Sequence, residues 1–145
     1  RAGTSVIHEP DSVTVSARPL HAFEFDATHC PDLFPALAAL AASAEGTTVL
    51  RGTSRLVHKE CDRAAAIRDE YGKLGIEVDL SEPDTMRIRG GAMHGCRVDS
   101  HGDHRMAMSL AVAALRSDGT MTIDGAECVA KSYPTFFDEL EKLRT

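Results

Sequence analysis

The chain is poor in aromatic residues, and its cysteines are not arranged as metal or redox pairs. It has no tryptophan, and only 5% of its 145 residues are aromatic. Cys30, Cys61, Cys96 and Cys128 are widely and almost evenly separated along the chain, so no C-x-x-C motif is present. This spacing argues against a disulfide framework and indicates reduced thiols in a cytoplasmic protein.

Long apolar runs and an excess of basic residues are also missing. The longest apolar stretch, residues 33–44, is rich in alanine and falls short of the ~20 residues of a membrane span, so we expect no membrane partner. The formal net charge of −6 argues against a nucleic-acid partner held through its phosphates. No signal-peptide pattern opens the chain. Because it begins with Arg1 rather than Met, we treat it as a fragment of a longer protein.

The patterns that are present predict a mixed α/β (α+β) fold in which helices pack against small mixed sheets. With 43% apolar and 26% charged residues, the chain has the composition of a globular domain with a sizeable core. Alternating or apolar segments predict strands, and segments with helical periodicity predict helices. The predicted strands are 12–16, 23–26, 47–50, 76–80, 86–88, 96–98 and 121–123, and the predicted helices are 32–46, 59–74, 104–115 and one beginning near 132–134.

An internal repeat joins residues of about 32–74 to residues of about 103–143. Asp32 and Asp103 each open a helical run that ends at a glycine. The segment 47–52 then matches 120–125, and Lys59 matches Lys131 after almost the same interval. Because a fold built twice from one unit places equivalent residues in equivalent surroundings, the repeat predicts a shared site as well as a shared scaffold.

Four groups of charged residues stand just before, or in the first turn of, a predicted helix. A helix N-terminus attracts anions and disfavours a cation by roughly 0.3–1 kcal/mol, so basic residues there need a reason. A bound anion would stabilise the dipole and the cations together, and arginine is suited to carboxylate or phosphate oxygens. These groups are Asp32, Lys59-Glu60 with Arg63, Asp103-His104-Arg105, and Lys131.

Simpler interpretations of the same residues stay open. Asp32 fits a plain helix N-cap, and Asp103 fits a cap followed by surface charge. Glu60 and Arg63 are three residues apart and fit a solvated ion pair on a helix.

A zinc site is a competing chemical interpretation. His101 and His104 are three residues apart with Asp103 between them, and His94 and Cys96 are near. However, the neighbouring Arg105 opposes a cation and Gly102 indicates a loop, so we expect no metal. A nucleophile elbow, a P-loop and a G-x-G-x-x-G turn are absent from the sequence.

Three of the charged groups carry longer motifs. Residues 59–63 (Lys-Glu-Cys-Asp-Arg) resemble the K-E-[ST]-D-R motif of the EPSP synthase (3-phosphoshikimate 1-carboxyvinyltransferase) family. Residues 103–108 (Asp-His-Arg-Met-Ala-Met) resemble its D-H-R-M-A-M motif, and residues 131–134 (Lys-Ser-Tyr-Pro) its K-[ST]-[FY]-P motif. Pro31-Asp32 and the turn at 46–48 agree as well, so the resemblance covers roughly Phe23 to the end of the chain.

The resemblance implies a two-domain enzyme of six repeated βαββαβ units, each domain an inside-out barrel. Residues 1–145 would be a C-terminal domain fragment with about two units and part of a third. The N-terminal domain, which holds most of the shikimate-binding residues, would be missing. The family transfers the enolpyruvyl group of phosphoenolpyruvate to the 5-hydroxyl of shikimate 3-phosphate in aromatic amino acid biosynthesis. It needs no cofactor, and we expect a cytoplasmic, monomeric enzyme whose isolated fragment is inactive.

The resemblance also assigns roles to single residues. Asp32 would contact the shikimate hydroxyls and help to deprotonate the 5-hydroxyl, Lys59 would bridge that hydroxyl and the enolpyruvyl group, and Glu60 would move a proton at the methylene carbon. Arg63, Arg105 and Lys131 would hold the phosphate and carboxylate of phosphoenolpyruvate, with His104 orienting them.

Three positions depart from the family pattern. Cys61 replaces serine or threonine, Val57-His58 replaces a pair such as Arg-Val, and Arg55 stands where some members have an asparagine that contacts the shikimate ring. These departures concern shikimate binding rather than the class of reaction. Two alternatives remain: the sister UDP-N-acetylglucosamine enolpyruvyltransferase, and a non-catalytic anion-binding module.

Overall fold

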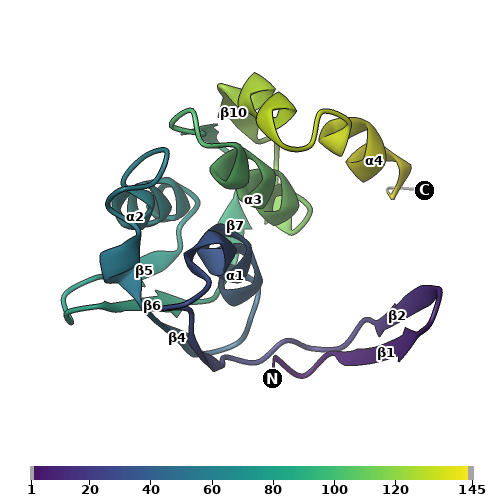
Figure 1. Cartoon of the computed structure of the whole chain (residues 1–145), viewed down its shortest axis with the longest axis horizontal. Coiled ribbons are helices and arrows are strands. Elements are labelled where there is room, and N and C mark those ends of the chain that lie inside the picture. Colours follow the sequence, from purple (N-terminus) through teal and green to yellow (C-terminus); the bar gives the residue numbers. More distant parts are fainter. Residues whose placement is uncertain (1, 144–145) are drawn as a thin grey trace.

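The chain folds into helices packed against several small sheets, as the sequence predicts (Figure 1). The computed structural model describes residues 2–143. Its α-helices are α1 (Phe34–Ala42), α2 (Arg63–Lys73), α3 (His104–Ala114) and α4 (Phe136–Lys142), with 3₁₀ turns η1 (Pro31–Leu33), η2 (Thr53–Arg55) and η3 (Ala126–Lys131). No helix among these residues is long and apolar enough to span a bilayer.

The largest sheet has four strands in the order β3-β4-β6-β5. β3 (Glu24–Asp26) runs parallel to β4 (Thr47–Arg51), and β6 (Thr85–Arg89) pairs antiparallel with both β4 and β5 (Glu77–Asp79). Three further pairs are β8 (Arg97–Asp99) with β10 (Thr122–Asp124), β7 (Met93–His94) with β9 (Ser117–Asp118), and β1 (Ser5–Glu9) with β2 (Ser12–Ser16). β1, β7 and β9 lie outside the predicted strands.

The core lies between the four-stranded sheet and helices α1, α2 and α3. Alternation along β6 turns Met86 and Ile88 inward, where both side chains are fully buried. α1 contributes Phe34 and several buried alanines, whose small side chains let it approach α3 closely. From α2, the Tyr71 hydroxyl reaches the Ser109 hydroxyl on α3 at 3.1 Å. The core thus fixes the three helices whose ends form the site.

Two segments share the order strand, helix, strand and 3₁₀ turn: β3-α1-β4-η2 and β8-α3-β10-η3, with η1 added in the first and β9 in the second. In both, a parallel strand pair is joined through one helix and followed by a left-handed glycine, Gly52 (φ 104°) or Gly125 (φ 68°). A Cβ at Gly52 would lie 2.6 Å from the Thr28 backbone, and one at Gly125 would lie 2.5 Å from the Ser100 hydroxyl. The backbone contact requires a glycine at Gly52, and the left-handed φ and the Ser100 contact favour one at Gly125.

The backbone hydrogen bonds fix which residues of these two segments correspond. Cys30 N–H donates to the Ala27 carbonyl at 2.9 Å, and Asp103 N–H donates to the Ser100 carbonyl at 3.0 Å. Asp103 is therefore the counterpart of Cys30, in the same register that makes Gly125 the counterpart of Gly52. The predicted pairing of Asp32 with Asp103 is two residues out of this register, and the counterpart of Asp32 is Arg105.

Three helices begin later than predicted. α1 begins at Phe34, because Pro31-Asp32-Leu33 form the 3₁₀ turn η1. α2 begins at Arg63 instead of Lys59, because the Asp62 side chain caps it by accepting from Ala65 N–H. α4 begins at Phe136, and Lys131 ends η3 four residues before the α4 cap. Lys59 and Lys131 were predicted to stand just before, or in the first turn of, a helix. Since Asp62 caps α2 and Thr135 precedes α4, neither lysine lies in a first turn or next to one.

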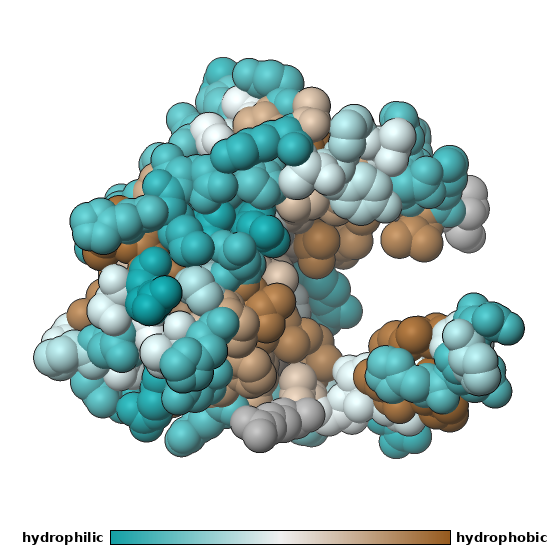
Figure 2. Space-filling model, viewed as in Figure 1, coloured by the Kyte–Doolittle hydropathy of each residue, from teal (hydrophilic) through white to brown (hydrophobic). Residues whose placement is uncertain are grey.

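The hairpin of β1 and β2 extends away from the rest of the molecule (Figure 1). The strand at 12–16 is confirmed, but its predicted buried face is not, since every β2 side chain is exposed. Apolar surface faces the opening between this hairpin and α4 (Figure 2). One hollow there, of about 940 Å³, is lined by residues of the hairpin, α1 and α3, including Val15, Leu40 and Leu115.

Candidate anion-binding site

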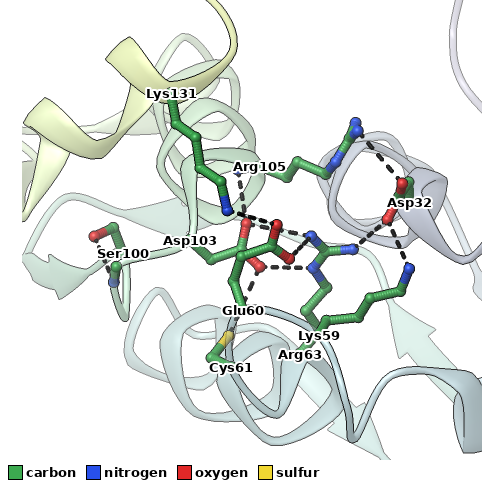
Figure 3. Close-up of polar contacts among 10 residues, drawn as sticks. Asp32, Lys59, Glu60, Cys61, Arg63, Ser100, Asp103, Arg105 and Lys131 are labelled. Carbon is green, nitrogen blue, oxygen red and sulfur yellow. Dashed lines mark hydrogen bonds and ion pairs between the residues drawn. The ribbon is translucent and has the colours of Figure 1, made fainter.

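Arg63, the first residue of α2, lies at the centre of a cluster of charges (Figure 3). Its side chain is completely buried and makes four hydrogen bonds to three carboxylates. Nε donates to Asp103 Oδ2 at 2.6 Å, Nη1 to Asp32 Oδ1 at 2.7 Å, and Nη2 to Glu60 Oε2 at 2.7 Å. Burial alone would lower the pKa of Arg63, but these carboxylates, Asp103 first, raise it above its ordinary value. The guanidinium therefore stays charged.

Asp103 joins this cluster to the start of α3. It is the N-cap residue, and its Oδ1 accepts from Arg105 N–H at 2.9 Å. The same fully buried carboxylate binds Arg63, so one side chain both caps a helix and neutralises a buried cation. Cys61 lies against it, with Sγ 3.8 Å from Asp103 Oδ2. Burial, with help from Asp103, raises the pKa of the Cys61 thiol to about 11, so the thiol is neutral.

Three further cations lie at the outer edge of the cluster. Lys59 Nζ is 3.2 Å from Asp32 Oδ1, and Arg105 Nη2 is 3.4 Å from Asp32 Oδ2. Lys131 Nζ is 3.2 Å from Glu60 Oε1. Their side chains are 28%, 38% and 62% exposed respectively, whereas that of Arg63 is not exposed at all. Arg63 therefore organises the acids from inside, and the outer cations face solvent.

Both outer carboxylates are ionised at neutral pH. The Arg63 hydrogen bond, followed by Lys59, lowers the pKa of Asp32 to about 2. The pKa of Glu60 is lowered by its own backbone N–H and then by Lys131 and Arg63. Each group is therefore a hydrogen-bond acceptor in this state and carries no proton to donate.

A small hollow adjoins the cluster between α1 and α3. It has a volume of about 230 Å³, with Asp32 and Arg105 among its lining residues. The remainder of the lining is mainly apolar: Ala36, Ala39, Met108, Ser109 and Val112. A small ligand that carries an anionic group would find charge at the Asp32–Arg105 side and apolar surface elsewhere.

The fold brings together most of the site residues predicted from the sequence. Those within the cluster are Asp32, Lys59, Glu60, Arg63, Arg105 and Lys131. His104 is buried beside them, and its Nδ1 has no hydrogen-bond partner among residues 2–143. Arg55 is exposed on η2, and no hydrogen bond or ion pair joins it to the described part of the cluster. Asp103 was placed in a charged group by its sequence but given no role, and its D-H-R context was the available signal.

Neither Asp32 nor the Glu60–Arg63 pair has the simpler role that its local pattern fitted. Asp32 is not a cap, because its side chain makes no capping hydrogen bond. The Glu60–Arg63 pair exists, but Arg63 is buried rather than solvated.

The candidate metal ligands are engaged separately. His101 contacts Glu70, His94 contacts Asp118, and Cys96 Sγ lies 3.6 Å from the Lys73 carbonyl oxygen. Residues 2–143 contain no group of three or more His, Cys, Asp or Glu side chains placed to hold a metal.

The fold is that of the enolpyruvyl transferases. The enolpyruvyl transferase NikO from Streptomyces tendae superposes with a TM-score of 0.77 at 28% identity, covering 99% of this chain and 33% of that one. An EPSP synthase structure from Acinetobacter baumannii superposes with a TM-score of 0.84 at 34% identity, covering 97% of this chain and 36% of that one.

Within that class, the chain belongs to the EPSP synthase (3-phosphoshikimate 1-carboxyvinyltransferase) family, whose model matches residues 1–140. The 3-phosphoshikimate 1-carboxyvinyltransferase of Methanocella arvoryzae is 46% identical over 93% of this chain and 32% of its own length. That of Syntrophobacter fumaroxidans is 45% identical over 100% of this chain and 34% of its own length. The chain therefore spans about a third of the length of these curated relatives.

Proposed function

We propose that this chain is the anion-binding part of an enzyme that transfers the enolpyruvyl group of phosphoenolpyruvate to the 5-hydroxyl of shikimate 3-phosphate. Family membership and the names of the relatives support this reaction. The observation that carries it is the cluster itself, in which Lys59, Arg105 and Lys131 face solvent around carboxylates held by Arg63. Lysine and arginine together suit a ligand with both phosphate and carboxylate groups.

In the proposed reaction, the 5-hydroxyl gives its proton to the Asp32 carboxylate and its oxygen bonds to C2 of phosphoenolpyruvate, while C3 takes a proton from the Lys59 ammonium. Lys59 Nζ lies 3.2 Å from Asp32 Oδ1 and can recover a proton from it. The tetrahedral adduct then loses phosphate from C2 and a proton from C3, which restores the double bond. Asp32 and Glu60 are ionised, so Asp32 can accept the hydroxyl proton and Glu60 the proton that leaves C3. Lys59 is the protonated group beside them. We assign Arg63 the task of holding these carboxylates, because its hydrogen bonds go to Asp103, Asp32 and Glu60.

The remaining two thirds of such an enzyme would supply the N-terminal domain and most of the contacts to shikimate 3-phosphate. We therefore expect the 145-residue chain to bind small anions but not to catalyse the reaction. In the full-length protein we expect a monomeric cytoplasmic enzyme.

The test is turnover of phosphoenolpyruvate and shikimate 3-phosphate by the full-length protein that contains this segment. Lys59→Ala and Glu60→Gln should each lower kcat at least a hundredfold, as expected when an acid–base group is removed. Glu77→Gln is the matched control, because Glu77 is an exposed acid on β5. A full-length protein that accepts only UDP-N-acetylglucosamine, or one in which both variants keep full activity, would contradict the proposal.

A further inference from the structure

A second buried carboxylate, Glu70, lies on α2 away from the charge cluster. It is 1% exposed and follows Arg63 by two helical turns, so both side chains lie on the same face of the helix. Its Oε2 accepts from Asp99 N–H at 3.0 Å, and its Oε1 lies 2.8 Å from His101 Nε2. Lys73 completes its surroundings, with Nζ 2.7 Å from Oε2.

The residues that Glu70 contacts belong to the connection between β8 and α3. His101 has a φ of 54°, in the left-handed region that residues with a side chain rarely adopt. A turn in which His101 N–H donates to Asp99 Oδ1 at 2.6 Å precedes Gly102, which is also left-handed. This backbone needs support from outside the connection, and Glu70 holds it at both Asp99 and His101.

The connection ends at Asp103, which caps α3 and binds Arg63. α2 therefore contacts this one connection at two places. Arg63 binds Asp103, and Glu70 binds Asp99 and His101. In the first segment the counterpart of His101 is Thr28. Thr28 N–H donates to Asp26 Oδ1 at 3.0 Å in the same kind of turn, but Thr28 does not have a left-handed backbone. The buried Glu70 carboxylate therefore contacts the connection that contains the left-handed residue.

We propose that Glu70 is a positioning residue of the anion site, acting through His101 and the Asp99 N–H to fix the β8–α3 connection. The connection in turn sets the Asp103 carboxylate against Arg63 and aims Arg105 at Asp32. The groups that face Glu70 are Lys73 on its own helix and the connection itself. The consequence for ligand binding rests on the proposed function.

Nuclear magnetic resonance of the 145-residue chain tests this directly. The Arg63 Nε–H signal reports the bond to Asp103, and a titration with inorganic phosphate reports the site. Glu70→Gln keeps the size of the side chain but removes its charge, and His101→Asn keeps a residue that tolerates the left-handed region but is too short to reach Glu70. Lys73→Met is the matched control, because it removes the exposed partner of Glu70 and leaves both contacts to the connection.

Glu70→Gln and His101→Asn should speed hydrogen exchange at Arg63 Nε–H, and Glu70→Gln should weaken phosphate binding about tenfold. Lys73→Met should change neither. A folded Glu70→Gln chain with an unchanged Arg63 signal would overturn the proposal even if its melting temperature fell, because Glu70 would then only add stability. Equal effects in Lys73→Met would overturn it too. If the unaltered chain binds no phosphate, the preformed site in the proposed function fails, and the Arg63 signal still decides the role of Glu70.

Discussion

The segments β3-α1-β4 and β8-α3-β10 share a backbone but carry opposite charges at one equivalent position. Asp32 and Arg105 occupy that position, and they contact each other at 3.4 Å because α1 and α3 lie side by side (Figure 1). Two residues earlier, the first segment has Cys30 where the second has the buried Asp103. The shared backbone thus places two pairs of residues in equivalent positions, and in each pair the two side chains differ in charge.

Arg63 links the two segments, because its guanidinium donates hydrogen bonds to Asp32 in the first and to Asp103 in the second. The cluster as a whole has one more cation than acid, which favours an anionic ligand. The cations are Lys59, Arg63, Arg105 and Lys131, and the acids are Asp32, Glu60 and Asp103.

Removing Arg63 should break the link between the segments and have the largest effect. Arg63→Ala leaves Asp103 buried and unpaired, so we expect a loss of about 3–5 kcal/mol in the free energy of unfolding. Urea unfolding measures this loss. Arg89→Ala is the control, since that arginine is exposed and should change stability by less than about 1 kcal/mol. A loss below about 1 kcal/mol for Arg63→Ala would show that the cluster does not join the segments.

Substitutions at the equivalent positions 30 and 103 should differ in how much they lower the free energy of unfolding. Asp103→Asn keeps a residue that can cap α3 but removes the negative charge that binds Arg63, and should cost about 2–3 kcal/mol in unfolding free energy. Cys30→Ala should cost about 1 kcal/mol or less, because Cys30 is only partly buried. The same urea experiment compares the two variants. Equal losses would mean that the buried acid adds nothing to the shared backbone.

Arg105 should matter more for binding than for folding. Its pair with Asp32 is partly exposed, so Arg105→Ala should lower stability by at most about 1 kcal/mol. Loss of a charged donor to phosphate should weaken binding about tenfold. Calorimetry with phosphoenolpyruvate measures the affinity, with Arg89→Ala again as the control. Unchanged affinity would place the ligand away from the α3 start.

The smallest effect is a dependence on pH. The pKa of Asp32 is lowered to about 2, below the usual value of about 3.9, so its contribution to stability is present above about pH 4 and lost as the pH falls towards 2. Because Asp32 is half exposed, we expect less than about 1 kcal/mol. Unfolding between pH 6 and pH 2.5 should show a shallower fall for Asp32→Asn than for the unaltered chain. Identical pH profiles would contradict this assignment.

Features set by local sequence were predictable. The apolar end of 47–50 and the alternation at 86–88 indicated two strands of the main sheet, and Asp103 before an apolar periodic run indicated the cap of α3. The motif residues pointed to the charge cluster before any geometry was known. Such signals work because capping and alternation involve neighbours in the chain.

Features set by distant contacts were not predictable. The local pattern around Asp32 also fitted a helix N-cap, but its contacts with Lys59 and Arg63 come from a turn and a helix much later in the chain. The left-handed His101 contacts Glu70, which lies on α2, far from it in the sequence. The alternation of β2 correctly indicated a strand, but burial depends on what packs against it, which alternation does not encode.

The most direct test of the central claim, a preformed anion site built around Arg63, is a titration of the 145-residue chain with phosphoenolpyruvate followed by nuclear magnetic resonance. The predicted result is a saturable set of amide shifts confined to residues near Arg63, Arg105 and Lys131, with inorganic phosphate competing for the same site. A folded chain that shows no such shifts, or shifts that persist in Arg105→Ala and Lys131→Ala, would contradict the claim.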